Sequence, residues 1–442
     1  MAISRRRFLT SGALTAAALG VPHPFQRALL GATNALAAPA DAILVLVQLE
    51  GGNDGLNTVI PIDDAPAVDQ RSLYESARPT IGIAVADLLD TEIDADPVKG
   101  NRLALHPALA SLHDVYAGGH LAVVNGVAYP NQSLSHFRSE DIWMGADPSG
   151  PFANGWMGRY LDSAFGPTDL VAVDLDKTLS PAFFSVNSNV LAVNALSEFT
   201  LGDDPLYPDL AAKKAALQAA YADEADPLST SGVQHQVGTS GSVLLGALDA
   251  YDAVDTSWSS NLNGKPGRLA RRLKDISSIL RNDVLGGNPL GARFFHVRLG
   301  GFDTHSNQGP LPGQGLLSGR QPDLFTELGT DLKAFYEDTV DLGIADKVVV
   351  LTFSEFGRRV AQNGGNGTDH GEASVLFALG DAVVGGVYGT VPALDDLNKG
   401  NLKAQIDFRQ VYATVIDKWL AAPGAHVPLL PGGPFTTLGF LT

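Results

Sequence analysis

Hydrophobic runs of strand length recur along the chain and alternate with segments that are polar or rich in glycine. The first run, from Ala42 to Leu49, ends in Gly51-Gly52-Asn53-Asp54-Gly55. A near-continuous apolar run of this length is typical of a parallel strand that is covered on both faces. Further runs of the same kind lie at 120–129, 169–175, 292–301, 346–353 and 374–380. We interpret all of them as buried strands.

Segments with helical spacing of apolar residues lie between these strands. Residues 106–119 carry apolar side chains at Leu109, Leu112 and Val115 and end in glycine, and similar segments lie at 204–224, 267–283 and 323–340. The alternation predicts an α/β fold with a doubly wound, mostly parallel sheet and helices on both faces. No linker divides the chain, so residues 38–442 are predicted to form one domain. Residues 62–101 are expected to be an irregular excursion from it.

The N-terminus carries the features of an export signal. Ser4 to Leu9 reads SRRRFL, a twin-arginine motif, and Ala35-Leu36-Ala37 offers the small residues that signal peptidase requires. Pro22 and Pro24 interrupt the apolar stretch between them, well before the roughly 20 residues that a membrane anchor needs. We therefore predict that residues 1–37 are a signal peptide recognised by the twin-arginine translocase. The mature chain is then periplasmic or secreted, with no integral membrane span.

The composition narrows the possible chemistry. Of the 442 residues 45% are hydrophobic and 18% are charged, which is a globular profile, and none is cysteine. A thiolate nucleophile and thiolate metal ligands are thereby excluded. The formal net charge is −18, and loss of the four arginines in residues 1–37 would take it to −22. Such an acidic surface disfavours nucleic acid as a partner.

Polar side chains collect where four of the predicted strands end. These segments are Asp54 with its flanking glycines, 131–143, 300–308 and 354–371. Taken singly, Asp54 could form a turn, Asp369 could cap a helix, and His305 could be a structural histidine. Because ligands bind at the carboxyl ends of strands in an open parallel sheet, the four segments together indicate a site.

The acids in these segments favour a metal centre. Carboxylates that converge in one crevice repel each other unless a cation compensates them. Oxygen and imidazole ligands suit one or two divalent ions such as Zn²⁺, Mn²⁺, Mg²⁺ or Ca²⁺. The candidate ligands are Asp54, Asp303, His305, Glu355, Asp369 and His370.

Five motifs and the leader resemble one bacterial family. The motifs are LVQLEGGNDGLNTVIP, SHFRSEDIW, GFDTHSNQ, SEFGRRVAQNGGNGTDHG and DFRQVYATVIDKWL. They closely resemble the exported family called domain of unknown function 1501, in order and over essentially the whole mature chain. That family resembles the alkaline phosphatase and sulfatase superfamily, whose fold is the doubly wound sheet.

The resemblance implies roles for particular residues. Asp54 matches a metal-binding Asp after the first strand, and Ser135, beside His136, matches a nucleophile at a helix start, with Ser133 as second choice. Asp303 and His305 resemble an Asp and His that bind one metal, although they are two positions apart where the superfamily usually has four.

The pattern breaks in the segment from Ser354 to Gly357, which falls on the superfamily's Ala-Asp-His-Gly. Glu355 can replace the Asp as an oxygen ligand, but Phe356 cannot replace the His. The Asp369-His370-Gly371 segment follows a glycine loop instead of a strand, and His370 is expected to supply the distant histidine of the site.

The function that the resemblance implies is metal-dependent hydrolysis of a small anionic ester, a phosphate or a sulfate. Ser135 and His136 would be catalytic, and Arg358, or else Arg359 or Arg138, would grip the anionic oxygens. The alternative is a non-catalytic periplasmic binding or assembly protein on a degenerate fold of the same kind.

Two other classes of protein lack their motifs here. A serine hydrolase of the α/β type needs a Gly-x-Ser-x-Gly elbow after a strand, whereas GTSGS at 238–242 is expected in a polar loop. No phosphate-loop or dinucleotide glycine fingerprint follows the first strand, which excludes the common nucleotide-binding folds.

Overall fold

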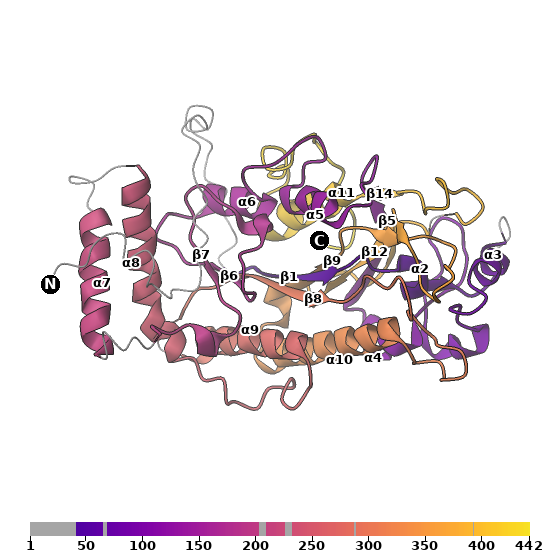
Figure 1. Ribbon diagram of the computed structural model, residues 1–442, viewed down its shortest axis with the longest axis horizontal. Helices are drawn as coiled ribbons and strands as arrows, with labels where there is room; N and C mark the ends of the chain where they lie inside the picture. The colour runs from indigo at the N-terminus through magenta and orange to yellow at the C-terminus, as the bar shows by residue number, and fades with distance from the viewer. Residues whose placement is uncertain (1–40, 65–68, 203–208, 226–231, 287–288, 392) are drawn as a thin grey trace.

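The computed structural model describes residues 41–64, 69–202, 209–225, 232–286, 289–391 and 393–442. The predicted signal peptide, residues 1–37, lies outside these ranges. The described residues form a nine-stranded sheet in the order β13-β5-β12-β9-β1-β8-β6-β7, and β14 pairs with β5 (Figure 1). Its strands are β1 (Ile43–Glu50), β5 (Leu121–Ala128), β6 (Ala172–Asp174), β7 (Val190–Ala192), β8 (Phe294–Gly300), β9 (Val348–Phe353), β12 (Ser374–Leu379), β13 (Gly386–Tyr388) and β14 (Ile406–Asp407).

The sheet is mostly parallel, and this confirms the predicted α/β class. In the centre, Leu46 of β1 pairs with His296 of β8 on one side and with Leu351 of β9 on the other, both in parallel register. The exception is β12, which runs antiparallel to β9 and β5. No helix lies between β9 and β12, and a crossover of that kind is what returns a chain to the same direction.

Helices cover both faces of the sheet in separate layers (Figure 1). One layer consists of α4 (Ala110–Ala117), α9 (Arg268–Leu285) and α10 (Arg320–Asp341), seen below the sheet. The other consists of α5 (His136–Gly145), α6 (Trp156–Ala164) and α11 (Phe408–Val415), seen above it. Within the described ranges, no helix combines the length and the apolar character needed to cross a membrane.

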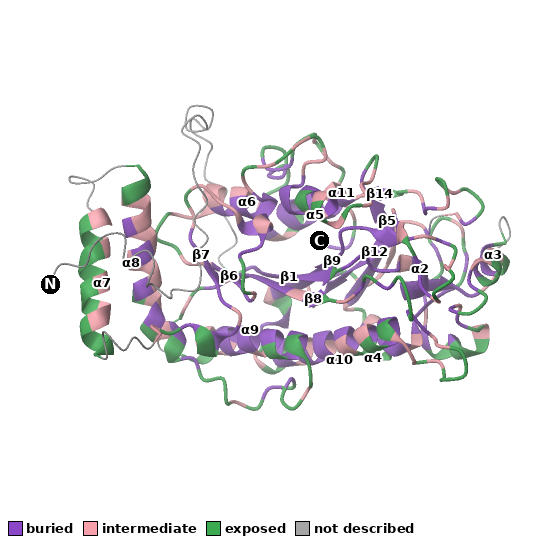
Figure 2. Cartoon of the chain, viewed as in Figure 1, coloured by how far each residue is buried: buried purple, intermediate pink, exposed green. Residues whose placement is uncertain are grey.

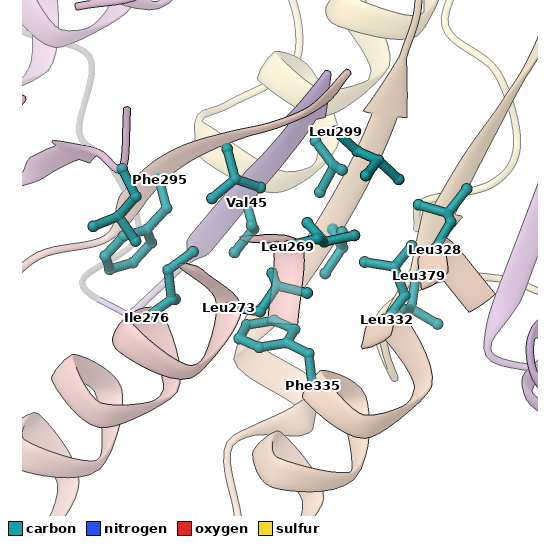
Figure 3. Packing of buried hydrophobic residues seen from close by; sticks show 14 of the residues in the cluster. Val45, Leu269, Leu273, Ile276, Phe295, Leu299, Leu328, Leu332, Phe335 and Leu379 are labelled. Carbon is teal, nitrogen blue, oxygen red and sulfur yellow. The ribbon is translucent and has the colours of Figure 1, made fainter. Parts of the chain in front are cut away.

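The central strand β1 supplies side chains to both cores. Val45 belongs to the cluster that includes Leu273 of α9 and Phe335 of α10 (Figure 3). Leu44 belongs to the opposite cluster, with Trp156 of α6. Side chains alternate between the two faces of a strand, so a strand covered on both faces is apolar throughout. This is the physical origin of the unbroken hydrophobic run at residues 42–49.

Two regions differ from the expectation. Residues 238–242 do not form a polar loop but lie inside α8 (Val233–Asp252), where glycines and polar residues at the start obscure the helical period. Helix α8 packs against α7 (Leu210–Ala225), which has no buried residue, at one end of the molecule (Figure 2). The excursion at 62–101 is not irregular throughout, because it contains α3 (Gln70–Ala77) and one strand of a small sheet.

Short elements complete the fold. Helix α2 (Gly55–Thr58) follows β1, and the small sheet has the order β2-β4-β3, with β2 (Val59–Pro61), β3 (Glu92–Ile93) and β4 (Leu103–Leu105). Strands β10 (Gly357–Arg358) and β11 (His370–Gly371) pair with each other. Single helical turns are η2 (Val85–Asp87), η3 (Leu89–Thr91), η4 (Pro107–Leu109), η5 (Pro181–Phe183), η6 (Leu196–Glu198), η7 (Ala345–Lys347) and η8 (Ile416–Leu420).

Candidate metal centre

Two glycines at the end of β1 allow neighbouring loops to approach closely. Gly51 and Gly52 have φ values of +121° and +85°, a region that side chains disfavour. A Cβ atom on Gly51 would overlap the backbone nitrogen of Asp303, and one on Gly52 would overlap the ring of Phe356. The glycine pair thus brings the segments after β8 and β9 together at the carboxyl edge of the sheet.

Three ligand-bearing side chains from distant parts of the sequence meet at this edge. They are His136 at the start of α5, Asp303 after β8, and His370 in β11, and their ligand atoms all lie within 4.8 Å of one another. Asp303 Oδ1 is 3.2 Å from His370 Nε2, and Asp303 Oδ2 is 3.7 Å from His136 Nε2. All three side chains are partly exposed, so an ion could enter from solvent.

His305 approaches the same group. Its Nε2 lies 2.9 Å from His370 Nε2 and 3.0 Å from Asp303 Oδ1. Its Nδ1 is 3.4 Å from Oδ1 of Asp369, an exposed carboxylate that also accepts a hydrogen bond from Asn363. His305 is therefore a candidate fourth ligand, and Asp369 lies behind it.

Hydrogen bonds orient two of the imidazoles. His370 donates its Nδ1–H to the backbone carbonyl of Leu134 at 2.8 Å, and His136 donates its Nδ1–H to Glu355 Oε1 at 2.8 Å. Each bond leaves the Nε2 lone pair directed to the centre, the usual arrangement of metal-bound histidine. Glu355 is buried and also accepts from Gly51 N at 2.8 Å, so the structure places it behind His136 instead of among the ligands.

The environment shifts the pKa values of the three groups. The hydrogen bond to Glu355 raises the pKa of His136, whereas burial lowers the pKa of His370. For Asp303, burial acts to raise the pKa, but the hydrogen bond and charge of Arg358 outweigh it and the pKa is lowered. A charged Asp303 and a neutral His370 are the protonation states that bind metal.

The side chain of Arg358 is buried and hydrogen-bonded within the protein interior. Its guanidinium is buried and donates to the backbone carbonyls of Gly51, Gly52, Phe302 and Thr368, and to Asp303 Oδ1 at 2.6 Å. The structure therefore places Arg358 where it orients Asp303. With its donors used in this way, it does not face a substrate as the sequence led us to expect.

Asp54 is not brought into the group of three. Its carboxylate caps α2 and forms an ion pair with Arg78 at 2.6 Å, and both side chains are fully buried. The sequence offered no signal for Arg78 as its partner. The hydrogen bond from His370 to the backbone carbonyl of Leu134 could not be predicted from the sequence either, because every residue carries a carbonyl.

Ser135 lies at the rim of the centre. It is the exposed N-cap residue of α5, and its side chain does not cap the helix. It stands between Leu134, which accepts a hydrogen bond from His370, and His136. Both neighbours are therefore tied to the centre. Phe356 forms the wall behind, with its ring centroid 4.8 Å from that of His136 and 4.6 Å from that of His370.

The donor set discriminates among metals. Two or three imidazoles with one carboxylate suit Zn²⁺ and other first-row transition ions, whereas Ca²⁺ and Mg²⁺ prefer oxygen ligands throughout. The residues present therefore fit a divalent transition metal, a narrower choice than the sequence allowed.

Comparisons with known proteins give one match to a family model. A family model described as "Protein of unknown function (DUF1501)" matches residues 289–427. A search of curated proteins finds no match.

Three solved structures are similar to the chain at low identity. A protein in the alkaline phosphatase superfamily from Vibrio parahaemolyticus has 7% identity and a TM-score of 0.33, covering 88% of this chain and 71% of its own. The lipoteichoic acid synthase LtaP from Listeria monocytogenes has 12% identity and a TM-score of 0.29, covering 82% and 74%. The phosphonate monoester hydrolase SpPMH from Silicibacter pomeroyi has 9% identity and a TM-score of 0.30, covering 91% and 78%.

With TM-scores this low, the α/β class rests on the chain's own strand order. The family match is of a different kind, because it is made on the sequence itself. The resemblance to the DUF1501 family is thereby confirmed over residues 289–427, the part of the chain that carries Asp303, His305, Glu355, Asp369 and His370.

Proposed function

We propose that the chain is an exported, metal-dependent hydrolase of phosphate or sulfate esters. One observation carries the proposal: His136, Asp303 and His370 converge at the carboxyl edge of a parallel sheet, and Ser135 lies beside them at the start of a helix. This edge is where open α/β sheets bind ligands. The twin-arginine leader supports the exported location.

The three converging side chains would hold one divalent ion, with His305 as the candidate fourth ligand. A divalent ion in such a centre polarises an ester oxygen and lowers the pKa of a nearby hydroxyl. Glu355 keeps His136 in the tautomer that presents Nε2, and Arg358 keeps Asp303 charged and oriented.

Ser135 is the proposed nucleophile. Its Oγ would form a bond to phosphorus or sulfur as the bond to the alcohol oxygen breaks, and the proton of the hydroxyl leaves with the alcohol through solvent. The free N–H groups in the first turn of α5 favour the anionic group that forms on Ser135. Water then cleaves this seryl ester, which returns the hydroxyl and releases phosphate or sulfate.

A second candidate function is binding without catalysis. The observation in its favour is that Arg358 and Arg138 direct donors to backbone carbonyls, of Gly52 and Thr368 in one case and of Pro148 and Gly150 in the other. Arg359, half-buried next to Asp369 in space, is then the remaining arginine of the three expected to grip an anion. A centre without an anion clamp would suit a metal-binding or assembly protein.

The test combines metal content with ester hydrolysis. The full chain, purified without chelators or an affinity tag of histidines, is analysed by mass spectrometry for Zn, Mn, Mg, Ca and Fe. It is then assayed with p-nitrophenyl phosphate and p-nitrophenyl sulfate. We expect one transition-metal ion per chain and measurable hydrolysis of one ester.

Variants separate the roles. Ser135→Ala should keep the ion and lose about 10³-fold or more in kcat, as removal of a nucleophile does. His370→Ala should lose both the ion and the activity. Ser257→Ala, which removes an exposed hydroxyl bonded to Asp255, is the matched control and should change neither. A bound ion without hydrolysis would favour the binding protein, and absence of a stoichiometric ion would refute the metal-dependent mechanism.

A further inference from the structure

A buried polar network lies behind the centre and takes no part in the proposed reaction. Its anchor is the ion pair of Asp54 and Arg78, in which Arg78 Nη1 donates to Asp54 Oδ2 at 2.6 Å and Nη2 donates to Oδ1 at 3.0 Å. Both side chains are 0% exposed. A bidentate pair of this geometry is strong and directional. Breaking it would leave an uncompensated buried charge, which is costly.

Gln308 connects this ion pair to the centre. Its Nε2 donates to Asp54 Oδ2 at 2.6 Å and to Gln321 Oε1 at 3.0 Å. Its Oε1 accepts from Thr304 Oγ1 at 3.0 Å and from Thr368 Oγ1 at 2.6 Å. A primary amide has two N–H donors and two acceptor sites, so Gln308 uses its whole hydrogen-bonding capacity in one buried position.

The two threonines belong to the two segments that carry ligands. Thr304 lies between Asp303 and His305, and Thr368 lies two positions before His370. Thr368 N also donates to the backbone carbonyl of Thr304 at 3.1 Å. A single buried amide therefore fixes both segments relative to Asp54.

Arg78 extends the connection to a third segment. Its Nε donates to the carbonyl of Val360 at 2.9 Å, and Nη2 donates to that of Arg359 at 3.0 Å. These carbonyls directly follow Arg358, the residue that orients Asp303. The guanidinium of Arg78 also occupies both oxygens of Asp54, so this carboxylate is not free to bind a second cation.

We propose that Asp54, Arg78 and Gln308 are positioning residues that hold Asp303, His305 and His370 in a ligating arrangement before any ion binds. Arg78 is the built-in cation of this network, so the centre takes one ion and not two. The inference rests on the metal centre of the proposed function and adds to it a support made of residues that touch neither ion nor substrate.

The test removes two hydroxyls without changing side-chain shape. The double variant Thr304→Val/Thr368→Val removes both hydroxyl groups that donate hydrogen bonds to Gln308 Oε1. Thr339→Val is the matched control, because Thr339 is buried and its hydroxyl donates only to the Tyr336 carbonyl within α10. Thr304→Ser/Thr368→Ser keeps both hydroxyls and should behave as wild type. All are made in the full chain.

Two readouts are taken. Hydrogen exchange of the metal-free protein should become about tenfold faster or more in peptides covering 301–308 and 363–371 of the Val double variant, and only there, because these segments are no longer held together. The Kd for Zn²⁺ should rise by about 10- to 100-fold, the usual effect of losing outer partners of a metal site. Thr339→Val should change neither readout.

The outcomes distinguish this inference from the proposed function. Unchanged exchange in both peptides of the Val double variant would overturn the positioning role, whether or not the wild type binds Zn²⁺. Two ions per wild-type chain would overturn the role of Arg78 as the replacing cation. A wild type that binds no Zn²⁺ would refute the metal centre, and hydrogen exchange would still decide whether the network holds the two segments.

Discussion

Among the pairs of a histidine and a carboxylate in the described residues, His296 with Asp174 and His136 with Glu355 differ most clearly in what surrounds them. His296 Nδ1 lies 2.9 Å from Asp174 Oδ1, and His136 Nδ1 lies 2.8 Å from Glu355 Oε1. The first pair joins neighbouring strands β8 and β6 and is 0% exposed. The second pair leaves His136 34% exposed at the edge of the sheet.

The difference lies at the far nitrogen of each ring. His296 Nε2 is buried without a hydrogen-bond partner among the described residues, and the ring centroids of Phe183 and Phe353 lie 6.3 Å and 6.4 Å from that of the imidazole. His136 Nε2 instead faces Asp303 and His370. A hydrogen-bonded pair of a histidine and a carboxylate is thus a structural element in one place and part of a candidate metal centre in the other. Access and further ligands decide the role, and the pair distance does not.

The largest expected effect concerns the buried pair. Asp174→Ala removes the acceptor of both His296 and the backbone N–H of Ser180, and it should lower the unfolding free energy by about 3–5 kcal/mol. Metal content should not change. Urea denaturation and metal analysis of the same preparation measure both quantities.

The double variant Asp174→Leu/His296→Leu sharpens this prediction. Replacement of both partners by apolar residues removes the imidazole that Asp174→Ala leaves unpaired, while the buried N–H of Ser180 stays without its acceptor, so part of the lost stability should return. A double variant as unstable as Asp174→Ala would show that packing, and not the pair itself, is responsible.

An intermediate effect is expected at the exposed pair, and here metal affinity should change while stability does not. Glu355→Gln keeps an oxygen that can accept from His136 but removes the charge that raises the pKa of this imidazole. The Kd for Zn²⁺ should rise by about 10- to 100-fold, with little change in unfolding of the metal-free protein. Glu198→Gln, at an exposed carboxylate that accepts from Asn194, is the control. An unchanged Kd would argue against His136 as a ligand.

The smallest effect concerns His106, which shows what burial does to a histidine without a carboxylate partner in hydrogen-bond contact. It is fully buried, its Nδ1 accepts from Ala108 N at 3.0 Å, and burial lowers its pKa to about 3. An unfolded histidine has a pKa of about 6.5. Between these values the unfolded state binds one more proton, so the unfolding free energy falls as pH falls, by about 1.4 kcal/mol per pH unit.

His106→Asn should remove this contribution. The asparagine oxygen can still accept from Ala108 N, but it does not titrate. The slope of unfolding free energy against pH is measured by urea denaturation between about pH 4.5 and 6 on metal-free protein. It gives the number of protons taken up on unfolding, and this number should be lower by about one in the variant. An identical slope in the variant would mean that other groups control the acid sensitivity.

Much of the sheet was predictable because its signals are local. The apolar run at 42–49 became β1, and the runs at 346–353 and 374–380 became β9 and β12. A central strand that is buried on both faces has an apolar residue at nearly every position, so a short stretch of sequence is enough to recognise it. The same holds for α9 and α10, whose apolar periodicity is plain.

The direction of β12 and the existence of α8 were decided by context. An apolar run does not indicate whether a strand is parallel or antiparallel to its neighbours. That direction depends on the connection that precedes the strand. Helix α8 contains Gly238 and Gly241 among its buried residues, positions that favour close packing but not helix formation. Local propensity was overridden there by packing against α7.

For the candidate site, the sequence by itself determined which segments carry the chemistry, because polar residues at strand ends stand out against apolar strands. It did not determine the role of each acid. Glu355 contacts His136 across 219 positions, and Asp54 meets Gln308 across 254. Which carboxylate faces an ion, which one faces a histidine and which one faces Arg78 depends on distances between residues far apart in the chain. Only the tertiary structure brings these residues within hydrogen-bond reach, because such bonds are effective over about 3 Å and leave no periodic pattern in the sequence.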